Sequence, residues 1–162
     1  MEMDGGILHA IEHSWLGVYA RTSVWLYPAA NVLHILSLTV FAASVAMMDA
    51  RLLGAFRAMQ PGPYLRSVRM IAVPAFLMML ATGSILFTAE ATHVAANPVF
   101  RIKLVLITLA LINALIFELA TSNAVRGLPA GTALPVAARI SAVLSLGLWL
   151  SVAAAGRLIA YF

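Results

Sequence analysis

Four histidines are the residues of this sequence whose chemistry best suits a metal or a prosthetic group. They are His9, His13, His34 and His93. The chain has no cysteine, which excludes thiolate ligands and disulfides. Imidazole, thioether and carboxylate groups are the ligands that remain. The sequence has no phosphate-binding loop, no HExxH motif and no nucleophile-base-acid set, so it gives no support for hydrolase or kinase chemistry.

The composition is that of a membrane protein. Apolar residues make up 63% of the 162 positions and charged residues only 10%, whereas soluble domains carry roughly 25% charged residues. The formal charge is +4, but the basic residues lie at the ends of apolar stretches and form no patch. We therefore exclude nucleic acid as a partner and expect the lipid bilayer to surround the chain.

Four apolar stretches are each long enough to cross a bilayer, which takes about 20 residues in a helix. They cover residues 28–48, 68–89, 99–121 and 136–159. Short connectors rich in glycine and proline separate them. The sequence predicts an all-α, integral membrane four-helix bundle that forms a single transmembrane domain over residues 1–162.

Residues 6–22 have apolar side chains at helical spacing, but they are too few and too polar to cross a bilayer. This pattern predicts an amphipathic helix that lies in the membrane interface. The preceding residues lack the basic segment of a signal peptide, so we expect the first span to act as its own insertion signal.

The distribution of basic residues predicts the orientation. If both termini lie outside, the inner side holds Arg51, Arg57, Arg66, Arg69, Arg126 and Arg139. The outer side then holds Arg21, Arg101, Lys103 and Arg157. Because inner loops are enriched in Lys and Arg, the excess favours an orientation with both termini outside. The Ala-rich composition and the absence of transit-peptide features predict a bacterial inner membrane, so we expect both termini to be periplasmic.

In this topology all four histidines lie toward the outer side of the membrane. His34 falls inside the first span, on a weakly polar stripe with Asn31, Ser37 and Ser44. An ionisable side chain within a span usually faces the bundle interior. One interpretation is a buried neutral imidazole hydrogen-bonded to another helix, and the other is ligation of haem or a metal.

The haem hypothesis uses His34 and His93 as the two axial ligands of one haem b. The two residues come from consecutive antiparallel helices, which should be neighbours. Arg101, Lys103 and Arg157 lie on the same side and would suit the haem propionates. Pairing with Glu2, Asp4, Glu12 and Glu90 is the alternative role for these basic residues.

Copper is the second hypothesis. His9 and His13 are four residues apart, so they share one helix face and can bind one metal. His34 or His93 would complete the site. A third hypothesis, from another class, is a structural subunit that anchors a larger complex and needs no histidine for a cofactor.

Two structural expectations concern the remaining polar and small residues. Charged residues at the inner ends of the spans should form salt bridges that fix helix ends; they are Asp49, Arg51, Arg66, Arg69 and Glu118. Gly147, Ser151 and Ala155 recur every four positions in the last span, where small residues let helices approach closely.

Several strings resemble a family of small, uncharacterised bacterial inner-membrane proteins. They are NVLH at 31–34, DARLLG at 49–54, TGSILF at 82–87 and NPVFRIK at 97–103. More distantly, the chain is similar to the membrane part of copper-resistance protein D and to four-helix cytochromes of the b561 type. These resemblances imply a four-helix bundle that handles haem b or copper. Only His34 carries over, and the chain lacks the histidines for two haems.

The sequence therefore predicts a small cytochrome-like membrane protein with one haem b near the periplasmic face. It would transfer electrons between a quinone or a membrane partner and a periplasmic redox partner. We expect an electron-transfer or metal-handling subunit rather than a stand-alone enzyme.

Overall fold

The computed structural model describes residues 5–161 as a set of helices without strands. Four of them are long: α3 (Leu26–Leu53), α4 (Pro61–Ala89), α6 (Pro98–Ile116) and α8 (Val136–Leu158). The others are short: α1 (Gly5–Glu12), α2 (Trp15–Thr22), α5 (Ala91–Ala96), α7 (Ser122–Arg126) and a 3₁₀ turn (Ile159–Tyr161). A π-helical turn, Phe117–Thr121, joins α6 to α7.

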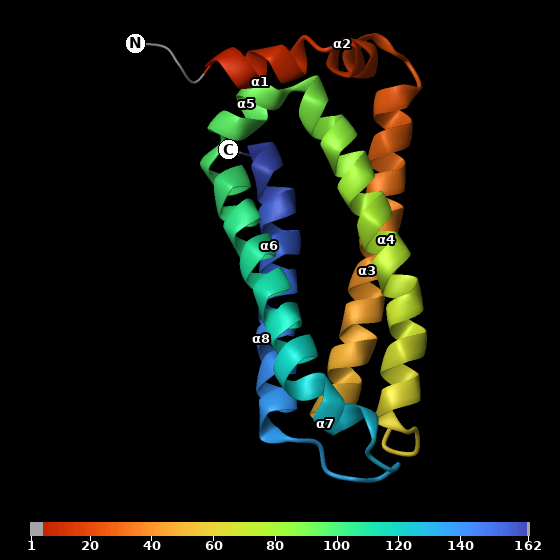
Figure 1. The fold of residues 1–162 in the computed structure, drawn as a ribbon. Coiled ribbons are helices and arrows are strands. Elements are labelled where there is room, and N and C mark those ends of the chain that lie inside the picture. The colour runs from red at the N-terminus through yellow and green to blue at the C-terminus, as the bar shows by residue number, and fades with distance from the viewer. Residues whose placement is uncertain (1–4, 162) are drawn as a thin grey trace.

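The long helices form two antiparallel pairs, α3 with α4 and α6 with α8 (Figure 1). All four are long and apolar enough to cross a membrane, counting α6 through α7 as one helix. The predicted four-helix membrane architecture is therefore confirmed, and the chain is a multi-pass membrane protein. Both termini lie at one end of the bundle, here called the terminal end; the α3–α4 and α7–α8 loops form the opposite, loop end (Figure 1).

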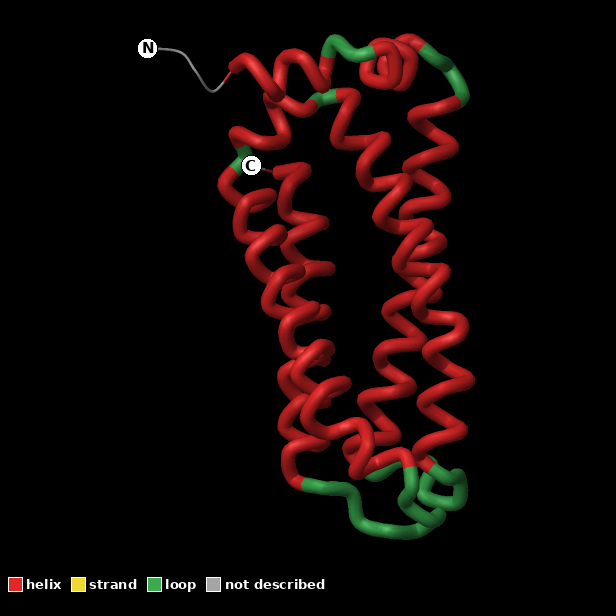
Figure 2. The backbone as a smooth tube through the Cα atoms, in the orientation of Figure 1, coloured by secondary structure: helices red, strands yellow, loops and turns green. Residues whose placement is uncertain are grey.

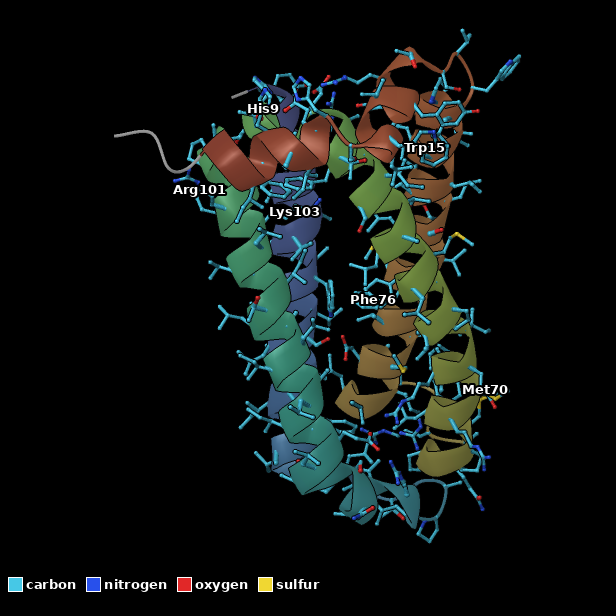
Figure 3. All side chains as sticks on the ribbon, turned by 45° about the horizontal axis from the view of Figure 1, so that its top comes forward. His9, Trp15, Met70, Phe76, Arg101 and Lys103 are labelled. Carbon is cyan, nitrogen blue, oxygen red and sulfur yellow. The ribbon has the colours of Figure 1, made fainter. Side chains whose placement is uncertain are left out.

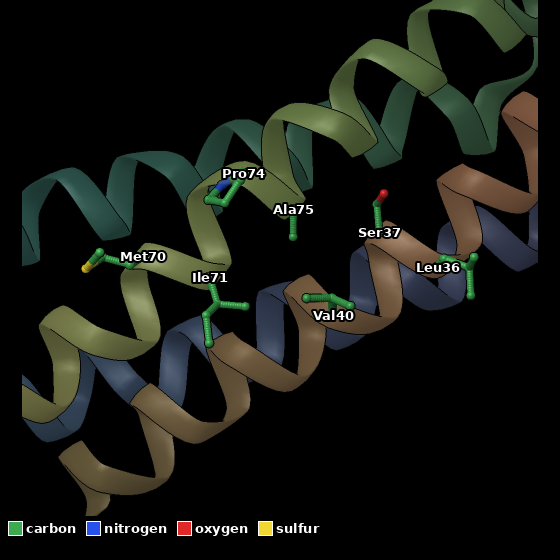
Figure 4. A pocket seen from close by; sticks show the side chains of 7 residues that line it. All are labelled: Leu36, Ser37, Val40, Met70, Ile71, Pro74 and Ala75. Carbon is green, nitrogen blue, oxygen red and sulfur yellow. The ribbon is translucent and has the colours of Figure 1, made fainter.

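Large apolar side chains cover the outside of the bundle. Met70, Leu119 and Leu150 are 73%, 74% and 69% exposed. Their surroundings in a bilayer are acyl chains, so these side chains need no protein core to cover them. A shallow groove of about 470 Å³ between α3 and α4, which includes Val40 and Pro74, has the same apolar character (Figure 4).

Two apolar clusters hold the two pairs together. In the first, Phe41 of α3 contacts Phe76 of α4 and meets Trp149 of α8 edge-on, at a ring-centroid distance of 4.7 Å. The second lies at the loop end and joins Leu65 of α4 to Phe117 and to α8. Both clusters therefore join the α3–α4 pair to the α6–α8 pair through contacts with α8.

The interfacial segment is not one helix, as the sequence predicted for residues 6–22, but two, α1 and α2, laid across the terminal end (Figures 1 and 2). Ser14 caps the second helix by accepting a hydrogen bond from the Gly17 amide. A Cβ at Gly17 would lie 2.8 Å from the Thr88 carbonyl oxygen of α4. Because Gly17 has no side chain, α2 can approach α4 closely.

Two long helices extend beyond the predicted spans at the loop end. Helix α3 continues to Leu53 instead of ending near residue 48, and α4 begins at Pro61 instead of near residue 68. Their extra turns carry charged residues such as Arg51 and Arg66. Apolar composition marks the edge of the hydrocarbon layer, whereas the helices continue into the polar interface.

Candidate functional site

His34 is the histidine that the structure builds into the bundle. It lies eight residues after the start of α3, about 12 Å along the helix axis at 1.5 Å per residue. Its Nδ1 is 3.0 Å from the Met79 carbonyl oxygen and 3.1 Å from the Thr82 hydroxyl, both on α4. The side chain is half-buried between the two helices.

These contacts determine which ring nitrogen carries the proton. A carbonyl oxygen can only accept a hydrogen bond, so Nδ1 of His34 must donate to Met79. In the neutral imidazole the lone pair then belongs to Nε2. Nε2 makes no hydrogen bond to any residue that the structure describes. A ring held through one nitrogen by a backbone carbonyl is the arrangement that orients histidine ligands of metals.

Gly83 makes room for this ring. A Cβ added at Gly83 would lie 3.0 Å from Cε1 and 3.4 Å from Nδ1 of His34. Those distances are shorter than ordinary van der Waals contact, so a larger residue would push the imidazole away. The glycine of the TGSILF string thus allows the Met79 hydrogen bond.

His93 lies elsewhere, on the short helix α5 beyond the end of α4, and it is exposed. Helix α5 packs against α1 and α6 at the terminal end (Figure 1). His93 therefore lies outside the long helices, while His34 lies within the bundle. The two residues share one end of the molecule but differ in depth.

His9 and His13 come together at the end of α1. Their rings stack with centroids 3.9 Å apart and planes inclined by 18°. The Nδ1 atom of His13 is 3.0 Å from the His9 carbonyl oxygen. Both are exposed, and Figure 3 shows His9 on α1 at the terminal end. Within residues 5–161, no group of three or more His, Asp or Glu residues is arranged to hold a metal ion.

The three basic residues proposed to accompany a haem all lie at the terminal end but differ in their contacts. Arg101 donates through Nε to the Ala95 carbonyl, and Arg157 donates to the Tyr161 hydroxyl and lies over its ring. Both are exposed. Lys103 is half-buried and lies against Gly156 of α8, where a Cβ would be 3.5 Å from its Nζ (Figure 3).

Lys103 differs from the other two because it lies within a membrane span, about 8 Å from the start of α6 at 1.5 Å per residue. None of the three ion pairs found among the described residues includes it. A lysine in this position favours an anionic group nearby.

Glu12 pairs with Arg21 rather than with Lys103, Arg101 or Arg157. Its Oε1 is 2.8 Å from Arg21 Nη1, and its Oε2 accepts a hydrogen bond from the Thr92 amide at 3.0 Å. Arg21 also donates to the Ala89 carbonyl. Mainly because of the Thr92 hydrogen bonds, the pKa of Glu12 is lowered below its usual range. The contacts of Glu12 and Arg21 thus attach α1 and α2 to the junction of α4 and α5.

At the loop end, the predicted salt bridges form in part. Glu118 pairs with Arg69 at 2.9 Å and with Arg126, a partner that the sequence did not indicate. Among the described residues, Asp49, Arg51 and Arg66 form no ion pair. Arg51 is 1% exposed and donates instead to the Met59 carbonyl at 2.8 Å. The arginine thereby holds the α3–α4 loop.

The sequence model of one protein family matches residues 7–162, nearly the whole chain. This chain belongs to the family of unknown function DUF6644. No curated protein and no solved structure matches it. The match agrees with the resemblance to small uncharacterised membrane proteins and covers the strings on which that resemblance was based. In this DUF6644 chain, His34 and Gly83 therefore belong to the family-matched region, as do all four histidines.

Proposed function

We propose that this DUF6644 protein is a small membrane cytochrome that holds one haem b near the terminal end of the bundle. It would transfer electrons between a quinone or membrane partner and a periplasmic redox partner. The observation that carries the proposal is the hydrogen bond from His34 Nδ1 to the Met79 carbonyl, because it directs the ring and leaves Nε2 available as an iron ligand.

The donor chemistry of this end fits a b-type haem. Haem iron is bound by a neutral imidazole nitrogen, and the backbone contact of His34 Nδ1 favours the tautomer with its lone pair on Nε2. When bound, the haem supplies one-electron oxidation and reduction. The protein contributes a fixed ring orientation and an apolar bundle that excludes water from the ligand.

Lys103 supports the same reading. A half-buried ammonium without an anionic partner among the described residues is unfavourable in a membrane span. A carboxylate such as a haem propionate would supply the missing charge. Arg101 and Arg157, nearer the surface, are the other proposed partners for propionates. Lys103 is the best placed of the three because its depth is closest to that of His34.

His93 is the proposed second axial ligand. It lies on α5, beyond the end of α4, and is exposed. Movement of α5 toward the bundle would bring it closer to His34. The resemblance to b561-type cytochromes supports His34 alone, so the role of His93 has to be tested separately.

The proposed location is a bacterial inner membrane, with the terminal end on the periplasmic side. The arginines at residues 51, 57, 66, 69, 126 and 139 belong to the loop end, where the α3–α4 and α7–α8 connections lie. The excess of positive charge there supports a cytoplasmic location for the loop end. The site around His34 would then face periplasmic partners.

A reduced-minus-oxidised absorption spectrum of the purified protein tests the proposal. We expect Soret and α bands that His34→Ala abolishes. If His93 is the second ligand, His93→Ala should retain haem but give a five-coordinate, high-spin spectrum. Thr108→Ala, a change on the exposed face of α6, is the control that should keep the wild-type spectrum. A wild-type protein without a Soret band after expression with ample haem would exclude the proposal.

A second candidate function is copper binding at His9 and His13. The stacking of their rings at the end of α1 favours it, because it brings two exposed imidazoles together. Metal analysis distinguishes the two functions: copper retained by the wild type and lost in a double His9→Ala, His13→Ala variant would favour this candidate. If neither haem nor copper is retained, the chain is best interpreted as a structural subunit that anchors a larger complex.

A further inference from the structure

The loop end contains a charged cleft that the proposed haem function does not use. It lies between the first turns of α4, the π-helical turn and α7, and its volume is about 550 Å³. Its lining includes three arginines, which are Arg66, Arg69 and Arg126. The cleft is at the loop end, where α4 starts, whereas His34 lies in the part of α3 nearer the terminal end.

The positive charge of this cleft is only partly compensated. Glu118 pairs with both Arg69 and Arg126. Arg66 forms no ion pair with any residue in the described part of the chain. Three guanidinium groups against one carboxylate leave a net charge of about +2 in one concave site, which favours an anionic ligand.

The backbone around the cleft is held in place. A Cβ at Gly62 would lie 2.4 Å from the Arg126 carbonyl oxygen, so α7 packs directly against the start of α4. On the other side, the Ser122 hydroxyl donates to the Glu118 carbonyl at 2.7 Å. The close approach at Gly62 fixes Arg126 on the same cleft as Arg66 and Arg69, although the chain separates them widely.

The position of the cleft indicates the source of an anion. Arg66 and Arg69 lie where the apolar stretch of α4 begins, so the cleft is at the level of lipid head groups. Leu65 and Phe117 add apolar surface beside the arginines. A site that combines guanidinium groups with apolar side chains at the level of the head groups suits the phosphate of a phospholipid.

We propose that this cleft binds a phosphate group, presented by the head group of an anionic phospholipid in the adjacent leaflet. Arg66 supplies the uncompensated charge, and its planar guanidinium can donate two hydrogen bonds to one phosphate. Arg69 and Arg126 complete the site, and Glu118, which pairs with both, positions them and offsets part of their charge.

Native mass spectrometry of the full chain, released from neutral detergent, measures this binding. The protein is titrated with phosphatidylglycerol, with phosphatidylcholine or with inorganic phosphate. We expect one phosphatidylglycerol to bind in preference to phosphatidylcholine, and Arg66→Gln to weaken it about fivefold. Arg139→Gln, which removes an exposed arginine at the same end but outside the cleft, is the matched control and should bind normally.

A Glu118→Gln variant makes the test independent of folding defects. Removal of the competing carboxylate should strengthen phosphatidylglycerol binding, whereas a purely structural ion pair predicts no gain. Binding of inorganic phosphate that Arg66→Gln also weakens would assign the site to free phosphate instead of lipid. If the protein retains the two lipids equally and binds no inorganic phosphate, the proposal is wrong. It is also wrong if Arg66→Gln and Arg139→Gln lose phosphatidylglycerol binding to the same extent. None of these outcomes depends on haem.

Discussion

Asn113 of α6 and Ser141 of α8 exchange two hydrogen bonds inside the spanning part of the bundle. The amide nitrogen of Asn113 donates to the Ser141 carbonyl at 3.0 Å, and the Ser141 hydroxyl donates to the Asn113 side-chain oxygen at 3.2 Å. Both residues are half-buried. Their hydrogen bonds connect α6 to α8 in a region where the lipid acyl chains offer no competing hydrogen-bond donor or acceptor.

Replacing Asn113 by Leu removes both hydrogen bonds but keeps a side chain of similar size. The variant therefore measures the contribution of the hydrogen bonds rather than that of packing. We expect a loss of roughly 1 kcal/mol in the free energy of unfolding, the usual size of an interhelical hydrogen bond in a membrane. Unfolding by sodium dodecyl sulfate in mixed micelles measures it. Thr108→Ala serves as the control, because Thr108 bonds only to Leu104 of its own helix. Equal stability of the two variants would contradict the expectation.

Gly83→Val should displace the His34 imidazole. The new side chain would occupy the space in which Cε1 now lies, 3.0 Å from a Cβ at residue 83. Overpacking of this kind costs about 1–3 kcal/mol, so the thermal midpoint should fall, and any cofactor spectrum should change with it. Gly147→Val is the comparison, since a Cβ there meets nothing within 4 Å. Similar thermal midpoints for Gly83→Val and Gly147→Val would mean that the His34 ring can move aside without a loss of stability.

The attachment of α1 should weaken in acid. The pKa of Glu12 is lowered from its ordinary 4.5 by the Thr92 hydrogen bonds and by Arg21, so its contribution is present above about pH 4.5 and is lost as the pH falls through the lowered value. The protection factor of the Thr92 amide in hydrogen exchange should fall in that window. In Glu12→Gln the protection should no longer depend on pH there, and a persistent dependence would point to another group.

Reporter fusions test the orientation. Alkaline phosphatase, which is active only outside the cytoplasm, should be active when fused after the last residue and inactive when fused after Pro129 in the α7–α8 loop. The reverse pattern would place the His34 site on the cytoplasmic side. The proposed redox partners would then have to be cytoplasmic.

The sequence was sufficient to predict the fold because each span is a predominantly apolar stretch long enough to cross a bilayer. The sequence also contains an N-cap pattern, Ser14 three residues before Gly17, which marks the start of α2. The small-residue pattern of the last span was partly misleading. Ala155 is buried, but Gly147 and Ser151 are exposed, and Ala138 and Ala142 make the close contacts instead. Apolar helices give little periodic signal for which face is buried.

The candidate site could be predicted only in part. The position of His34 in a span indicated an inward-facing side chain, and the alternative of a hydrogen bond to another helix is what the structure contains. Its acceptor could not be identified, because the acceptor is a backbone carbonyl that every residue possesses. The pairing of Arg126 with Glu118 could not be predicted from the sequence either, because it depends on how the chain turns after α6.

That turn is the π-helical segment Phe117–Thr121, which places one more residue in a helical turn than an α-helix accommodates. Deleting one residue there would remove the bulge and restore regular α-helical spacing, so the side chains of this segment would face other directions than they do now. Phe117 could no longer fill the apolar cluster while Glu118 faces Arg69. The family should therefore tolerate changes of residue type in this segment more readily than a change in its length.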